Sequence, residues 1–169
     1  MNFIQLSLII YFLPLLAFVI NILIGKRLPR QGDWISIGAV GISLALSIAM
    51  FAGMLVNYNP DFSVETFWSW IYLGSFNINL GFLIDNITII MLLVVALIST
   101  MTHLFSIKYM EGDSRYSRYY AYLSLFTFSM NGIVLSNNLM LLYMSWELVG
   151  LSSFLLIGFW FEKDSASTA

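Results

Sequence analysis

The stretch LLYMSWELVGLSSFLLIGFW, residues 141–160, decides what surrounds this chain, because its aliphatic and aromatic residues enclose a single carboxylate, Glu147. A helix needs about 20 mostly apolar residues to cross a bilayer core about 30 Å thick, and this stretch has that length. The composition agrees, since 60% of the residues are hydrophobic and only 9% are charged, whereas a soluble domain has about 25% charged residues. The sequence therefore predicts an integral membrane protein.

Charged and polar breaks divide the 169 residues into apolar segments of similar length. Pro14 lies inside the first segment, where it predicts a kinked helix or a helix that starts late. We expect an all-α membrane bundle of about five transmembrane helices, forming a single membrane domain over residues 1–169. The predicted spans are Phe3 to Ile24, Trp34 to Val56, Phe82 to Ile107, Tyr119 to Ser136 and Leu139 to Phe161.

The basic residues predict the orientation of these spans. All seven follow the first, third or fifth span: Lys26, Arg27, Arg30, Lys108, Arg115, Arg118 and Lys163. Cytoplasmic loops are enriched in Lys and Arg. The N-terminus is therefore predicted outside and the C-terminus inside.

The outer loop, residues 57–81, has a strand-like pattern. Apolar residues at Phe76, Ile78, Leu80 and Phe82 alternate with Asn or Gly, and Gly74-Ser75 is typical of a tight turn. This pattern predicts a short outer, periplasmic β-hairpin. The hairpin could cap its own bundle, or it could dock through an exposed edge on a neighbouring subunit.

Glu147 is the strongest candidate functional residue. It lies eight residues beyond the outer end of the fifth predicted span, at a depth of about 12 Å. Ionisable residues at such depths are costly and rare, face the interior of a bundle and are commonly functional. Gly150, one turn away, leaves room for water or a partner side chain. One interpretation is a proton relay; the other is a protonated glutamate that only bonds to a neighbouring helix.

His103 is the second candidate and the only histidine in the chain. Histidine titrates in the range that a proton path needs, but a single histidine near an interface is about as often structural. It belongs to a polar stripe on the third predicted span: Ser99, Thr102, His103 and Ser106. A similar stripe on the fourth predicted span, Ser124, Thr127 and Asn131, could hold water or make helix–helix hydrogen bonds.

Three segments carry a resemblance to a known family. They are MTHLFSIKYMEGD at 101–113, LGFLIDNIT at 80–88, and the run from Arg118 to Trp160 that contains the WELVG motif followed by LIGFW. The chain closely resembles the N-terminal part of the large antiporter-like membrane subunit of respiratory complex I, called NADH-quinone oxidoreductase subunit L or subunit five. The resemblance implies proton translocation, a key glutamate on the fifth helix that matches Glu147, and outer hairpins that contact adjacent antiporter-like subunits.

This chain is much shorter than the members of that family, and so resembles an N-terminal fragment. The lysine that the resemblance implies as a partner for Glu147 belongs to a later helix. Every Lys and Arg of this chain lies between or beyond the predicted spans. We therefore expect half of an ion pair here and no complete channel.

The resemblance implies a proton-translocating membrane-arm subunit of NADH:quinone oxidoreductase, a translocase. The alternatives are the large subunit of a multisubunit Na+/H+ antiporter and a truncated, non-transporting scaffold.

With no cysteine and no G-x-G-x-x-G motif, we expect this chain to bind no redox cofactor or metal, and NADH and quinone to be used by the parent complex. Expected partners are the lipid bilayer and other complex I membrane subunits, especially the adjacent antiporter-like subunit. A net charge of -2 argues against nucleic acid. The expected location is the bacterial cytoplasmic (inner) membrane or, alternatively, the mitochondrial inner membrane.

Overall fold

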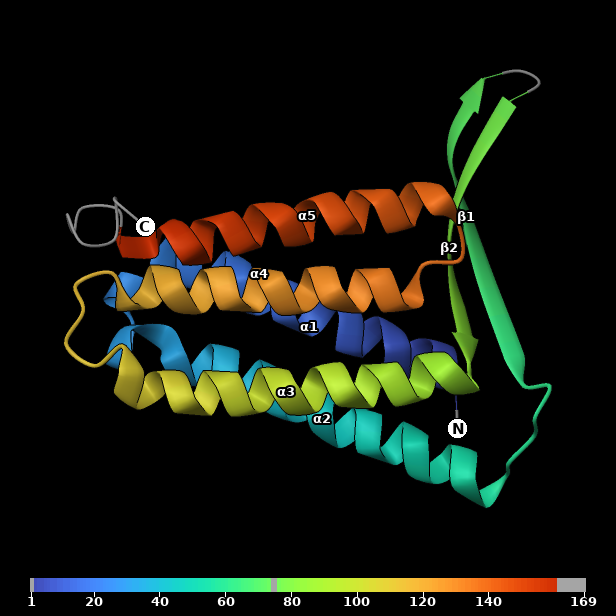
Figure 1. Cartoon of the computed structure of the whole chain (residues 1–169), viewed down its shortest axis with the longest axis horizontal. Coiled ribbons are helices and arrows are strands. Elements are labelled where there is room, and N and C mark those ends of the chain that lie inside the picture. The colour runs from blue at the N-terminus through green and yellow to red at the C-terminus, as the bar shows by residue number, and fades with distance from the viewer. Residues whose placement is uncertain (1, 74–75, 161–169) are drawn as a thin grey trace.

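Five long helices lie side by side, and a β-hairpin lies across one end of them (Figure 1). The computed structural model describes residues 2–73 and 76–160. This arrangement confirms the predicted helical bundle with a hairpin. The helices are α1 (Phe3–Ile24), α2 (Asp33–Val56), α3 (Asn86–Tyr109), α4 (Tyr116–Leu135) and α5 (Leu139–Ile157), and the 3-10 turns are η1 (Gly25–Arg27), η2 (Pro29–Gly32) and η3 (Gly158–Trp160).

Helix α4 is the centre of the bundle, because it packs against α1, α2, α3 and α5. Most of its polar side chains are buried, among them Ser124, Thr127 and Asn131. Among the described residues, four helices are long and apolar enough to cross a membrane, namely α1, α2, α3 and α5. Helix α4 is of similar length but more polar, and most of its residues are buried against the other helices. Five long helices are present, as predicted, but only four of those described have the length and hydropathy of a membrane span.

Helix α1 begins at Phe3, where the side chain of Asn2 accepts a hydrogen bond from the backbone nitrogen of Gln5. It continues through Pro14 without interruption. The predicted late start at Pro14 is therefore wrong. Proline lacks only its own N–H donor, and the loss of one donor can be offset when a neighbouring helix supplies another.

The hairpin is longer than predicted. Strand β1 (Ser63–Leu73) pairs antiparallel with β2 (Phe76–Asp85), so the second strand continues past Phe82. Helix α3 begins at Asn86, because the Asp85 carboxylate accepts a hydrogen bond from the Thr88 backbone nitrogen at 2.7 Å and caps the helix. The predicted start of this span at Phe82 is therefore wrong. The predicted turn at Gly74-Ser75 lies outside the described residues.

The hairpin is attached to the bundle where β2 passes the connection between α4 and α5. The Asn137 backbone nitrogen donates to the Gly81 carbonyl at 3.2 Å, and the Asn138 amide donates to the Asn79 carbonyl at 2.7 Å. A side chain at Gly81 would place its Cβ 2.3 Å from the Thr66 carbonyl oxygen, so only glycine fits there. The hairpin therefore caps its own bundle, while its far end extends past α5 (Figure 1).

The two ends of the bundle differ in charge. We call one the hairpin end, where the hairpin and the start of α1 lie (Figure 1). We call the other the basic end, formed by η1, η2, the connection between α3 and α4, and η3. Six of the seven Lys and Arg residues lie at the basic end, and the seventh, Lys163, lies outside the described residues. This segregation is the feature from which the orientation was predicted.

Candidate functional site

Glu147 lies near the middle of α5, about 12 Å from its start at Leu139. Its side chain is exposed, and it lines an open surface groove together with Tyr143 and Trp146. The Tyr143 side chain, one turn earlier, lies beside the carboxylate. Among the described residues, Glu147 therefore lies on the outer surface of the bundle and not in its interior.

The reason is the helical periodicity of α5. Its buried residues, Leu141, Ser145 and Ser152, share one face because they are separated by about one, two and three turns. Glu147 projects from the opposite face. Gly150 lies on this open face, and a Cβ built there would have no neighbour within 4 Å. The structure thus leaves space beside the carboxylate, as expected from the sequence.

His103 is fully buried in α3. Its Nδ1 lies 2.8 Å from the Ser99 carbonyl oxygen, and a carbonyl can only accept, so Nδ1 carries the proton in the neutral ring. The Nε2 atom is then a hydrogen-bond acceptor. It has no partner among the described residues, and a buried acceptor in that state is rare.

The two predicted polar stripes meet beside His103. The Ser99 hydroxyl lies 2.6 Å from the Thr127 hydroxyl, which joins α3 to α4. Ser106 pairs with the Tyr119 hydroxyl at 3.2 Å, whereas Thr102 bonds only to its own helix, at the Ile98 carbonyl. The stripes therefore form helix–helix hydrogen bonds around one unpaired imidazole nitrogen.

A second buried cluster joins α1, α2 and α4. The Asn21 amide donates to the Ser36 hydroxyl at 2.7 Å, and Ser36 lies 2.8 Å from the Ser124 hydroxyl. The Oδ1 atom of Asn21 is buried and has no partner among the described residues. A Cβ at Gly32 would lie 2.2 Å from this Oδ1 atom, which is too close for any side chain. The φ of +79° at Gly32 favours glycine as well. Sequence reasoning missed Asn21, although a lone amide near the end of an apolar run was a usable signal.

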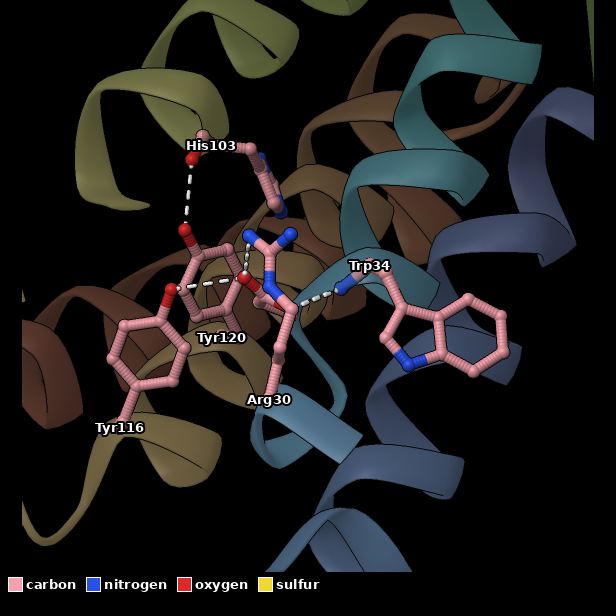
Figure 2. Close-up of polar contacts among 6 residues, drawn as sticks. Arg30, Trp34, His103, Tyr116 and Tyr120 are labelled. Carbon is pink, nitrogen blue, oxygen red and sulfur yellow. Dashed lines mark hydrogen bonds and ion pairs between the residues drawn. The ribbon is translucent and has the colours of Figure 1, made fainter. Parts of the chain in front are cut away.

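Asp33 was also missed, and it is the most buried carboxylate among the described residues, with 1% of its surface exposed. It begins α2 and pairs with Arg30 at 2.8 Å. The Tyr116 hydroxyl donates to the same oxygen at 3.1 Å, and the other oxygen accepts from the Trp34 backbone nitrogen. Figure 2 shows these contacts together with Tyr120 and His103. An acidic residue directly before an apolar span was the sequence signal.

Asp33 lines an open cavity of about 530 Å³ at the basic end. Lys108 and Glu111 form an ion pair in its wall, and the Lys108 ammonium lowers the pKa of the Glu111 carboxyl. The cavity thus connects a buried carboxylate with a charged, water-accessible rim. The full lining is Arg30, Gln31, Asp33, Ile107, Lys108, Glu111, Gly112, Asp113, Ser114 and Tyr116.

The structure does not bring the two predicted site residues together. His103 lies 17 residues from the start of α3, about 26 Å from the hairpin end, whereas Glu147 lies about 12 Å from it. Glu147 also projects away from the bundle, while His103 is enclosed by it. They therefore belong to separate sites.

Comparisons with known proteins agree across nearly the whole chain. Residues 70–120 match the family model of NADH-ubiquinone oxidoreductase (complex I), chain 5 N-terminus. Residues 136–169 match the model of the transmembrane region of NADH:quinone oxidoreductase and Mrp antiporters. Together these two matches cover the last four residues of β1 and the whole of β2, α3 and α5.

Two curated relatives show how far the similarity extends. NAD(P)H-quinone oxidoreductase subunit 5 of Physcomitrium patens chloroplasts is 41% identical over 95% of this chain. NADH-quinone oxidoreductase subunit L of Neisseria meningitidis is 39% identical over 100% of it. The chain spans 23% and 25% of these relatives, about a quarter of their length.

A third relative and a solved structure widen the comparison. F(420)H(2) dehydrogenase subunit L of Methanosarcina mazei is 40% identical over 98% of this chain and 24% of its own length. A chain of the membrane-bound sulfane sulfur reductase, an archaeal respiratory membrane complex, shares the fold, with a TM-score of 0.64 and 19% identity over 88% of this chain and 22% of that chain. This chain belongs to the family of antiporter-like membrane subunits found in NADH:quinone oxidoreductase, where they are named subunit L or subunit 5.

Proposed function

We propose that this chain is the N-terminal part of a proton-translocating membrane-arm subunit of NADH:quinone oxidoreductase, with Glu147 as a proton relay. One observation carries the proposal. A carboxylate lies near the middle of a membrane helix, on a face that the described residues leave open, with free space beside it at Gly150. A carboxylate on lipid alone would cost several kcal/mol, so another helix of the full-length subunit covers this face and supplies a cationic partner.

The proposal also covers the orientation, cofactors, partner and membrane of the chain. All five helices cross the membrane, with the basic end inside and the hairpin end outside. The chain binds no redox cofactor or metal itself, because NADH and quinone react in other subunits. The far end of the hairpin contacts the adjacent antiporter-like subunit. The membrane is the bacterial cytoplasmic membrane.

A second candidate function has specific support. The family model that matches residues 136–169 covers Mrp antiporters as well as NADH:quinone oxidoreductase. In an Na+/H+ antiporter Glu147 would exchange protons against a sodium gradient without electron transfer. A ΔpH formed on NADH addition distinguishes the first function, and a ΔpH formed on an Na+ pulse distinguishes the second.

The test of the proposal replaces Glu147 in the full-length subunit within the assembled complex. Glu147→Gln keeps shape and hydrogen bonding but cannot ionise, so we expect a loss of most NADH-driven ΔpH in inverted vesicles, normalised to complex content. Glu147→Asp should retain part of it. Glu65→Gln is the matched control, because it makes the same chemical change on an exposed residue of β1, outside the helices. Wild-type ΔpH with Gln at position 147 would leave the non-transporting scaffold as the better interpretation.

A further inference from the structure

We propose that Asp33 is a proton-uptake group at the basic end of the bundle, and that it delivers protons to His103 along a path separate from Glu147. This inference rests on the proposed function, since it names the place where protons reach the helices. It assigns a role to a buried carboxylate and to an unpaired imidazole nitrogen.

Asp33 has the position that a proton-uptake group needs. Its carboxylate is buried, yet it lines the open cavity at the basic end, so a water molecule in the cavity can reach it. Charged and titratable groups face it from every side of the cavity: Arg30 from η2, Lys108 from α3, Glu111 and Asp113 from the connection between α3 and α4, and Tyr116 from α4. The mixed charges keep the rim hydrated.

His103 has the position that a receiving group needs. The hydrogen bond from Nδ1 to the Ser99 carbonyl fixes the tautomer and leaves a lone pair on Nε2. That atom is buried and unpaired within the described residues. A buried lone pair without a donor is satisfied when a proton or a water molecule arrives there. The geometry thus points to a ligand that is a proton donor.

Two tyrosines contact the two residues, Tyr116 at the Asp33 carboxylate and Tyr120 at the backbone carbonyl of His103. The Tyr116 hydroxyl donates to Asp33 at 3.1 Å, and its ring lies 4.9 Å from the ring of Tyr120. The Tyr120 hydroxyl donates to the backbone carbonyl of His103 at 2.9 Å, and the Tyr120 and His103 rings are 5.9 Å apart. In Figure 2 the imidazole of His103 extends from α3 toward Arg30.

The proton transfer is balanced at each step. A hydronium ion in the cavity protonates the Asp33 carboxylate and leaves water. The carboxyl group then releases this proton, through water beside the tyrosine hydroxyls, to Nε2 of His103, which becomes an imidazolium while Asp33 becomes a carboxylate again. The imidazolium returns to the neutral ring when Nε2 passes a proton to the next acceptor. No oxidant or reductant is required.

The experiment uses the full-length subunit in its complex, in inverted vesicles whose outer face is the basic end. We expect Asp33→Asn to lower the initial rate of NADH-driven ΔpH formation at least fivefold at unchanged complex content, and Asp33→Glu to restore part of it. Asp85→Asn is the matched control, because it is the same substitution on a helix-capping residue at the hairpin end, and it should pump normally. Arg30→Gln breaks the ion pair but keeps the Asp33 carboxylate, so it should pump at more than half of the wild-type rate.

Each outcome decides between interpretations. Normal pumping by Asp33→Asn would overturn the inference. Equal losses in Asp33→Asn and Arg30→Gln, with less assembled complex in both, would also overturn it, because a structural ion pair predicts that pattern. The proposed function fails separately, when Glu147→Gln pumps normally in the same assay, whatever the Asp33 variants do.

Discussion

The side-chain amide of Asn131 on α4 donates a hydrogen bond to the backbone carbonyl of Ile10 on α1, at 3.2 Å. Ile10 precedes Pro14 by four residues, so the helical donor that this carbonyl would normally receive is absent. Inside a membrane a backbone carbonyl without a donor costs several kcal/mol. Asn131 replaces the missing donor and thereby fastens α1 to the central helix.

This relationship predicts that Asn131 and Pro14 are energetically coupled. Asn131→Leu should lower the stability of the assembled subunit by about 1–3 kcal/mol, because the Ile10 carbonyl loses its donor. In a Pro14→Ala background the helix supplies its own donor, and the same substitution should cost clearly less. The measurement is a double-mutant cycle on the unfolding free energy in detergent. If the effects of the two substitutions are additive, Asn131 does not compensate for the backbone donor that is missing at Pro14.

The proposed orientation predicts which face of the membrane each loop reaches. The chain has no cysteine of its own, and Ser114 and Ser63 are exposed at the basic and hairpin ends. Ser114→Cys should react with a membrane-impermeant thiol reagent only in inverted vesicles, and Ser63→Cys only in right-side-out ones. Labelling is read on the purified subunit by mass. The reverse pattern would mean that the basic end is outside.

The hairpin predicts a contact with the adjacent subunit. Its far end extends past α5 (Figure 1) and carries Tyr72, which is 75% exposed. Tyr72→Ser should loosen the association of the neighbouring antiporter-like subunit on native gels, because exposed aromatic residues commonly anchor interfaces. Tyr58→Ser is the matched control, since Tyr58 is 64% exposed but precedes the hairpin. Unchanged assembly in both variants would leave the hairpin as a cap of its own bundle only.

Much of the fold was predictable because the bilayer imposes a simple length rule. The first predicted span ends where α1 ends, at Ile24, and the fifth begins where α5 begins, at Leu139. The third start was wrong because the last apolar residues of β2, Phe82 to Ile84, lead into the apolar run of α3, so hydropathy does not separate strand from helix. The boundary between β2 and α3 is set by the hydrogen bond from the Thr88 backbone nitrogen to the Asp85 carboxylate. This bond depends on local backbone geometry, which hydropathy does not report.

The candidate site was less predictable, because burial depends on which face of a helix meets its neighbours. The residue type and depth of Glu147 were readable, but not that it projects away from the described helices. Asp33 was overlooked because Arg30 beside it suggests an exposed loop, and Asn21 because it lies near the end of the first predicted span. Their burial comes from contacts with Tyr116 and with Ser36, and such contacts between distant segments have no signature in a single sequence.

The last prediction compares two glycines on neighbouring helices. A Cβ at Gly132 on α4 would lie 2.6 Å from the Ser145 hydroxyl of α5 and 3.3 Å from the Tyr11 ring of α1, whereas Gly150 has nothing within 4 Å. Gly132→Ala should therefore cost about 1–3 kcal/mol by forcing three helices apart. Gly150→Ala should leave stability unchanged or raise it by up to about 1 kcal/mol, because alanine favours the helix.

The measurement is the thermal midpoint at which the assembled subunit loses its native-gel band, compared between the two variants at equal expression. A Gly132→Ala, Ser145→Gly double variant should recover most of the loss, because removing the serine side chain empties the space that the new methyl group needs. If Gly150→Ala is the more destabilising of the two, the open face of α5 is tightly packed against another helix in the full-length subunit. In that case the space beside Glu147 is filled by protein, and water does not reach the carboxylate through Gly150.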